Sequence, residues 1–344
     1  MQRSNKNSIL FILLSLVLVS FFIMNISLGA VKIPLEDVVK SITGGTAAKE
    51  TWQYIIINYR LPKAITAVVV GMGLSVSGLL MQTLFRNPLA GPYVLGLSSG
   101  ASLGVAFVLL GAGMLPAALS IFFLSPYGIV LASTLGSLLV LLAVLLVARR
   151  LRDTMAILIV GLMFGSFTGA IVGILTFFST AEQLQKFTFW SLGSLGNLPW
   201  GHVGIMATVC AAGLMLAACC IKPLNALLLG ERYAISMGIN FRRTRFIIIA
   251  ATSLMAGGIT AFAGPIAFVG LAVPHMAKLL FRTSSHFVLY RATLLIGGII
   301  VLLCDTLTQL PGNNFILPVN AITSIIGAPV VVWLLLRRRK GIYS

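Results

Sequence analysis

The stretch that decides the fold runs from Arg60 to Gly104 and reads RLPKAITAVVVGMGLSVSGLLMQTLFRNPLAGPYVLGLSSGASLG. Two apolar runs flank a polar segment at 82–92, which contains an Asn-Pro and a Gly-Pro pair. Proline lacks an N–H and disfavours helix at the residue before it, so one helix ends here and a second begins. Glycines at 96, 100 and 104 then share one helical face, which predicts close packing against a neighbouring backbone.

Composition identifies the class of protein. Of 344 residues, 58% are hydrophobic and 9% are charged, with a mean hydropathy of +1.05, whereas soluble domains carry about 25% charged residues. The net charge of +17 does not indicate nucleic-acid binding, because the basic residues cluster at the ends of apolar runs and no nucleic-acid-reading module surrounds them. The sequence therefore predicts an integral membrane protein.

The apolar runs predict an all-α protein with about ten membrane segments in a single domain, 1–344. The first run, after Arg3 and Lys6, resembles the core of a cleaved signal peptide, but its length favours a retained helix. A proline-broken run at 265–281 is too short for an ordinary span and predicts a short or re-entrant helix. The other expected segments are the apolar run that follows Arg60 and ends before Gln82, two within 87–148, 154–180, one that ends at Lys222, 242–264, 291–310 and 319–336.

The distribution of basic residues predicts the orientation. If both termini are cytoplasmic, 18 of the 24 lysines and arginines lie on the cytoplasmic side. The inverted topology would reverse that bias, which contradicts the positive-inside rule. We therefore expect both termini in the cytoplasm.

The segment 223–241, PLNALLLGERYAISMGINF, is longer than a simple connector, since median loops are about 4–6 residues. Its apolar residues and two glycines predict short amphipathic helices separated by bends. Such a surface lies against lipid or accepts a partner helix.

Several motifs, in order along residues 55–337, resemble the FecCD family of permease subunits of ABC importers. They are Arg60-Leu61-Pro62, Ser77-Gly78, Gln82, Arg86-Asn87-Pro88-Leu89-Ala90, Pro92, Leu95-Gly96, Leu229-Gly230-Glu231 with Ala234 and Gly238, Gly264-Pro265-Ile266, Phe268-Val269-Gly270-Leu271, Pro274-His275 with Lys278, and Gly327-Ala328-Pro329. The resemblance implies a type II importer permease in the bacterial cytoplasmic (inner) membrane. Its substrate would be an iron–siderophore, haem or cobalamin. Its implied partners are a second copy of itself, two ATPase subunits and a periplasmic or lipid-anchored substrate-binding protein.

The resemblance also implies roles for individual residues. Within the coupling helices at 223–241, the residues expected to dock the ATPase are Leu229, Gly230, Glu231, Ala234 and Gly238. Arg60 and Lys63 are expected to meet acidic residues of the binding protein, although simple interfacial snorkelling also explains them. The remaining expected motif residues, with structural or pathway roles, are Gln82, Arg86, Asn87, Pro88, Gly161, Gly165, Gly169, Pro274 and His275.

Two of these features allow a second interpretation. The glycines at 161, 165, 169 and 173 form a small-residue face that serves either helix packing or a gate helix that approaches its twin. His275 has no second ligand at metal spacing, which favours a structural hydrogen bond over a metal site. The four cysteines lie in apolar runs without ligand or disulfide spacing, and we interpret them as small core residues.

Asp305 is the one acid within a membrane segment, so it requires a charged partner or a wet cavity. The family pattern has an arginine four residues later and then Glu-x-Pro-Val-Gly. Here Gln309 and Ile316 occupy those two positions. These two differences from the family pattern affect the contacts with the binding protein that the resemblance implies.

The sequence argues against two other classes of protein. An ion-coupled secondary transporter requires several buried acids or half-helix ion sites, and only Asp305 qualifies. An intramembrane enzyme requires a nucleophile–base pair or a metal cluster, which the sequence lacks. No Gly-x-x-x-x-Gly-Lys-Ser/Thr loop is present, so ATP hydrolysis is expected on another chain, and this chain is expected to bind no cofactor or metal.

Overall fold

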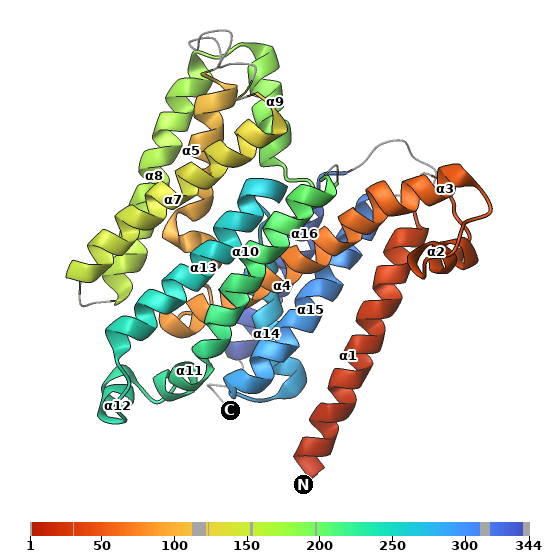
Figure 1. Cartoon of the computed structure of the whole chain (residues 1–344). Helices are drawn as coiled ribbons and strands as arrows, with labels where there is room; N and C mark the ends of the chain where they lie inside the picture. The colour runs from red at the N-terminus through yellow and green to blue at the C-terminus, as the bar shows by residue number, and fades with distance from the viewer. Residues whose placement is uncertain are drawn as a thin grey trace. The chain divides into compact units, whose positions relative to one another are not determined.

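The computed structural model describes residues 2–29, 31–111, 122, 124–151, 154–196, 198–309 and 317–339. Every regular element within these ranges is helical (Figure 1), which confirms the all-α prediction. In chain order the elements are α1 (Gln2–Ser27), α2 (Leu35–Ile42), α3 (Glu50–Ile55), the π-helix η1 (Ile56–Arg60), α4 (Leu61–Leu84), the 3₁₀-helix η2 (Pro92–Leu95), α5 (Leu97–Leu109), α7 (Pro126–Arg150), α8 (Thr154–Phe177), α9 (Ala181–Ser191), α10 (Trp200–Cys219), α11 (Ile221–Leu227), α12 (Glu231–Ser236), α13 (Phe241–Ala263), α14 (Val269–Phe281), α15 (His286–Thr308) and α16 (Val319–Arg339).

The apolar helices match the expected membrane segments. Within the described ranges, seven helical stretches are long and apolar enough to cross a bilayer, and three shorter apolar helices, α5, α14 and part of α16, accompany them. A span needs about 20 residues at 1.5 Å rise per residue. The 13-residue α14 confirms the short helix predicted at 265–281.

The structure corrects several boundaries. The sixth segment ends at Cys219, not at Lys222, because the chain turns at Cys220 and resumes as the separate helix α11. Helix α15 begins at His286, five residues before the expected start. The polar segment 31–59 is itself largely helical, since α2, α3 and η1 lie within it.

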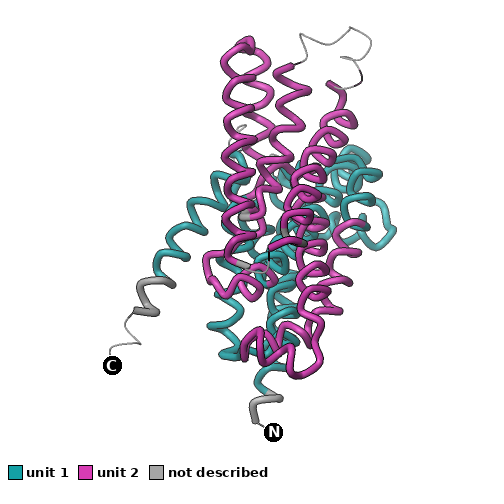
Figure 2. The backbone as a smooth tube through the Cα atoms, turned by 90° about the vertical axis from the view of Figure 1, so that its left-hand side faces the viewer, with its two compact units in different colours: residues 1–79, 194–208, 267–344 teal, residues 80–193, 209–266 magenta. Residues whose placement is uncertain are grey.

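Contacts between Cα atoms divide the chain into two compact units, coloured separately in Figure 2. Unit 1 comprises residues 1–79, 194–208 and 267–344, and unit 2 comprises residues 80–193 and 209–266. Helices α4 and α10 each begin in unit 1 and end in unit 2.

Unit 1 is assembled through glycines that bring helix backbones together. A methyl group added to Gly71 of α4 would lie 2.2 Å from the carbonyl oxygen of Gly297 in α15. One added to Gly78 would lie 1.7 Å from the carbonyl oxygen of Gly270 in α14. These separations exclude any side chain, so Gly71 and the motif residue Gly78 are both required for α4 to pack in this unit.

Unit 2 uses the same device on α5, which lies alongside α7 and α8 (Figure 1). Methyl groups added to Gly100 and Gly104 would lie 2.6 Å and 2.0 Å from the carbonyl oxygens of Gly136 and Ala132. The predicted close packing of this face is confirmed. Gly96, however, precedes α5, and its φ of +74° makes it a left-handed turn residue.

Candidate functional site

The segment 223–241 forms the two short helices α11 and α12, as the sequence predicted. Its buried side chains face the protein, with Leu224, Leu227 and Ala234 almost inaccessible to solvent. Its exposed apolar side chains are Leu228, Leu229, Tyr233, Ile235 and Met237, and Leu229 is 67% exposed. Exposed apolar side chains gathered in one short segment indicate a contact with a partner or with lipid.

The five residues expected to dock the ATPase occupy different positions in this segment. Gly230 (φ +121°) and Gly238 (φ +84°) adopt left-handed conformations at the two ends of α12. Glu231 begins α12, where a negative charge favours the positive end of the helix dipole. Leu229 is exposed, whereas Ala234 is fully buried and therefore holds α12 against the rest of the chain.

Arg86 connects this segment to the Arg-Asn-Pro motif. Its Nη2 atom donates a hydrogen bond of 3.3 Å to the carbonyl oxygen of Leu227, the last residue of α11. The two residues are 141 positions apart, and both belong to unit 2. Sequence reasoning missed this contact because nothing in either motif specifies the other as a neighbour.

The rest of the Arg-Asn-Pro motif forms a tight turn. The side-chain Oδ1 of Asn87 accepts a 2.9 Å hydrogen bond from the amide of Leu89, and its backbone carbonyl accepts one from Ala90. In such an Asx turn the side chain takes the place of a backbone carbonyl, which fixes the chain reversal around Pro88. Pro88 is half-buried in this turn, and Gln82 is buried in the last turns of α4.

Arg60 is engaged inside unit 1. Its Nη1 donates to the carbonyl oxygens of Ile26 (2.7 Å) and Ser27 (2.9 Å), and its Nη2 donates to that of Val31. These carbonyls lie at and just beyond the end of α1, where helical partners are lacking. The guanidinium therefore caps α1 and complements the negative end of its dipole.

Lys63 and Asp305 form a largely buried ion pair, with 3.0 Å between Nζ and Oδ1 and side-chain exposures of 16% and 2%. The other carboxylate oxygen, Oδ2, accepts hydrogen bonds from the side-chain amides of Asn25 (2.9 Å) and Gln309 (3.3 Å). Asp305 thus has the charged partner that its position requires. Ile316 lies outside the described residues.

The glycine face of α8 is divided. Gly161 is buried, and its carbonyl oxygen would lie 2.8 Å from a methyl group on Gly96. A methyl group on Gly165 would touch Ser99 Oγ at 3.4 Å. Gly169 and Gly173 are exposed, and no described atom lies within 4 Å of where their methyl groups would be. The first half of this face packs within unit 2, and the second half is open.

Pro274 is buried within α14, and the next residue, His275, makes a local hydrogen bond. Its Nδ1 lies 3.0 Å from the carbonyl oxygen of Leu271, which requires a proton on that nitrogen. Within the described residues no group of three potential metal ligands is found. Three of the four cysteines are buried, but Cys219 is exposed, so its interpretation as a core residue is wrong.

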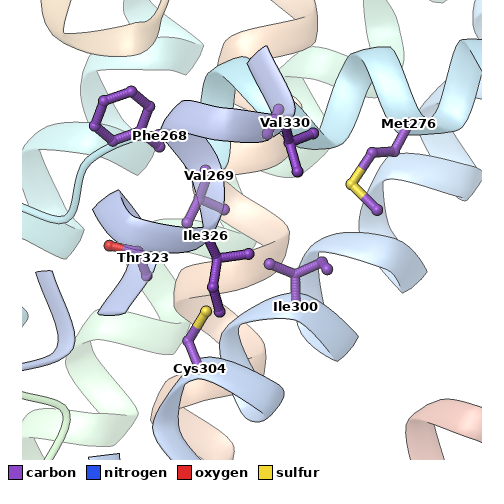
Figure 3. Close-up of a pocket in the computed structure, with 10 residues that line it drawn as sticks. Phe268, Val269, Met276, Ile300, Cys304, Thr323, Ile326 and Val330 are labelled. Atoms are coloured by element: carbon purple, nitrogen blue, oxygen red, sulfur yellow. The ribbon is translucent and has the colours of Figure 1, made fainter. Parts of the chain in front are cut away.

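An apolar cavity of about 60 Å³ lies among α14, α15 and α16 of unit 1. Figure 3 shows Met276, Ile300, Cys304, Ile326 and Val330 around it. Ligand pockets are usually about 300–1,000 Å³ and combine apolar walls with placed polar groups. This cavity is too small for a chelate, and its apolar lining offers no hydrogen bonds to an ordered water.

Comparisons with known proteins agree with this arrangement. The profile of the FecCD transport family matches residues 16–337. The chain is 35% identical to the hemin transport system permease of Yersinia pestis over 301 residues, which is 86% of this chain and 87% of that protein. It is 36% identical to the vitamin B12 import system permease of Escherichia coli O9:H4 over 282 residues, 82% and 83% of the two chains.

Among solved structures, the chain is similar to a metal-chelate type ABC transporter in an inward-facing conformation. The TM-score is 0.83 at 25% sequence identity, over 95% of this chain and 99% of that one. A second structure, PsaBC of Streptococcus pneumoniae in complex with Fab, shares the fold with a TM-score of 0.53 at 16% identity, over 88% and 95% of the two chains. The family profile covers more than nine-tenths of the sequence, and the motifs of that family lie in the contacts described above. The chain belongs to the FecCD transport family.

Proposed function

We propose that this permease carries a metal chelate of the iron–siderophore, haem or cobalamin class across the bacterial cytoplasmic membrane. In this proposal it works as a homodimer with two ATPase subunits and a periplasmic or lipid-anchored binding protein. ATP is hydrolysed on the ATPase subunits, and this chain binds no cofactor. The relatives named for hemin and vitamin B12, and the similar metal-chelate transporter, support this class of substrate.

The exposed apolar surface of α11 and α12 is the observation that carries the proposal. Leu229 and Met237 are 67% and 60% exposed in a segment bordered by Lys222, Arg242 and Arg243. Apolar side chains on a basic, water-facing loop are stabilised when a partner covers them. An ATPase subunit docked here would cover Leu229, and Glu231 would face it from the first turn of α12.

The open half of the α8 glycine face supports the homodimer. Gly169 and Gly173 have room for a neighbouring helix to approach closely, and α8 carries no charged residue. Small-residue faces favour close association of helices in membranes. A second copy at this face would place the substrate pathway between the two permeases.

The orientation of the chain follows from its basic residues. The segments that carry 18 of the 24 lysines and arginines, among them 223–241 and both termini, then lie in the cytoplasm. The junction of η1 and α4, which carries Arg60 and Lys63, faces the binding protein.

The contacts of Asp305 count against an ion-coupled secondary transporter. Such a transporter requires a membrane acid that exchanges protons or cations during transport. Asp305 is already neutralised by Lys63 and held by two amides. Its carboxylate therefore has the environment of a fixed structural charge.

The proposal is tested by purifying the chain together with the ATPase encoded beside it, in the wild type and in Glu231→Arg. Glu182→Arg is the matched control, because Glu182 also lies in the first turn of a short exposed helix, α9, outside the docking segment. We expect wild type and Glu182→Arg to retain the ATPase and Glu231→Arg to lose most of it.

Transport itself is measured as uptake of cyanocobalamin, haemin and a ferric siderophore into vesicles with and without ATP. ATP-dependent uptake of one of these probes supports the proposal. Uptake driven by an ion gradient in the absence of the ATPase would overturn it.

A further inference from the structure

Arg86 lies two residues beyond the end of α4 and adopts an unusual backbone conformation. Its φ is +47°, in the left-handed region, where a β-carbon costs conformational energy that glycine avoids. Helices commonly end with a residue in this conformation, and that residue is usually glycine. An arginine at this position indicates that its side chain has a task that glycine cannot perform.

The side chain reaches the junction between α11 and α12. Its Nη2 donates to the carbonyl oxygen of Leu227 at 3.3 Å, and a methyl group on Gly230 would lie 3.8 Å from the same nitrogen. The same carbonyl accepts a 3.2 Å hydrogen bond from the amide of Gly230, and the end of α11 carries the negative end of the helix dipole, so a guanidinium is favoured there. Leu227 is itself buried, which fixes the acceptor in place.

The backbone of Arg86 connects two further elements. On one side it continues the uninterrupted 24-residue helix α4. On the other side it leads into the Asn87 turn, then into η2 and α5. Helix α5 packs on α7 with backbones in direct contact at Gly100 and Gly104, so a displacement of α5 is passed on to α7 without intervening side chains.

We propose that Arg86 is a positioning residue that carries movement of the segment 223–241 into the end of α4 and the turn at 87–95. The guanidinium holds the junction of α11 and α12 at a fixed distance from the end of α4, so movement of the junction displaces the turn. Arg86 contacts neither the substrate nor the ATPase in this scheme. The inference rests on the proposed function, because it requires an ATPase docked on 223–241.

The test uses Arg86→Gly and Arg86→Lys in the full complex with its ATPase, reconstituted in vesicles. The glycine variant removes the guanidinium and also relieves the backbone strain. The matched control is Arg282→Gly, because Arg282 ends α14 at a φ of +46° and its side chain makes no hydrogen bond with any residue that the structure describes. Strain relief is therefore common to both variants, and only Arg86→Gly removes the contact with Leu227.

The readout is the rate of maleimide labelling of Leu89→Cys, with ATP and vanadate and without nucleotide. Leu89 is 46% exposed in the turn after Arg86, and the exposed Cys219 is replaced by serine in every variant. We expect nucleotide to change the labelling rate of Leu89→Cys in the chain that retains Arg86 and in the Arg282→Gly variant. In Arg86→Gly this response should fall about tenfold or more, the effect of losing one hydrogen bond with a charged donor. Arg86→Lys should restore part of it.

The outcomes separate the two proposals. A nucleotide response that Arg86→Gly retains in full, or that Arg282→Gly loses equally, overturns the positioning role and leaves the importer intact. If the complex that retains Arg86 binds the ATPase but nucleotide does not change the labelling rate at residue 89, the positioning role is also overturned. A wild-type chain that does not bind the ATPase overturns both.

Discussion

The Lys63–Asp305 pair predicts an asymmetric response to removal of either partner. Lys63→Met leaves a carboxylate that is 2% exposed and that accepts, among the described residues, from the amides of Asn25 and Gln309. Breaking a buried ion pair costs about 3–5 kcal/mol, and the two remaining donors place this variant near 3 kcal/mol. Asp305→Asn instead leaves a lysine that is 16% exposed and can extend its ammonium towards water, so about 1–2 kcal/mol is expected.

The assay is reversible unfolding of the purified chain in mixed micelles of a mild detergent and increasing SDS. A double-mutant cycle with Lys63→Met, Asp305→Leu and the combined variant isolates the pair. Because the combined variant leaves no buried charge, it should be about 2 kcal/mol more stable than the sum of the single effects predicts. Lys186→Met is the matched control, since its partner Glu182 is fully exposed and their ion pair is screened by water.

Two results would refute this reasoning. Single effects that add within about 0.5 kcal/mol would show that Lys63 and Asp305 are not coupled. A larger loss of stability in Asp305→Asn than in Lys63→Met would show that the buried charge requiring compensation is the lysine.

Two further predictions concern backbone contacts. Gly104→Val places side-chain atoms about 2.0 Å from the carbonyl oxygen of Ala132. It should lower the free energy of unfolding by about 3 kcal/mol or prevent folding. Gly204→Val is the control and should leave the free energy of unfolding unchanged, because no described atom lies within 4 Å of a methyl group at that position. Arg60→Ala removes three hydrogen bonds at the end of α1, and should increase amide hydrogen exchange across residues 24–33 while exchange in α15 is unaffected.

Much of the fold could be predicted because run length and charge alone determine where a membrane helix fits. The helices at 97–109 and 269–281 could also be predicted from the sequence, since proline and glycine mark their starts. Boundaries near Cys220 could not be placed, because α10 and α11 are both apolar and a single turn separates them. The π-helix at 56–60 has no sequence signature at all.

Only part of the candidate site could be predicted from the sequence. The short helices of 223–241 follow from its pattern, but the sequence did not separate the buried Leu227 and Ala234 from the exposed Leu228, Ile235 and Met237. The contact between Arg86 and Leu227 joins positions 141 apart, and the pair Lys63–Asp305 joins positions 242 apart. Sequence reasoning required a partner for Asp305 but had no means to choose among 24 basic residues.

Docking of the binding protein at Arg60 and Lys63 stays a prediction. Because both residues make contacts within this chain, the effect of substituting them on binding has two possible causes. A weaker complex in Arg60→Ala would not identify a lost contact, because the same change frees the end of α1 and thereby moves the surface around it. Arg60→Lys keeps the charge but not the fork that reaches three carbonyls. If docking depends on charge at this rim, the lysine variant should bind the binding protein as wild type does, although its α1 exchanges faster. If docking depends on the position of α1, both variants should weaken binding together, in proportion to the exchange measured at residues 24–33.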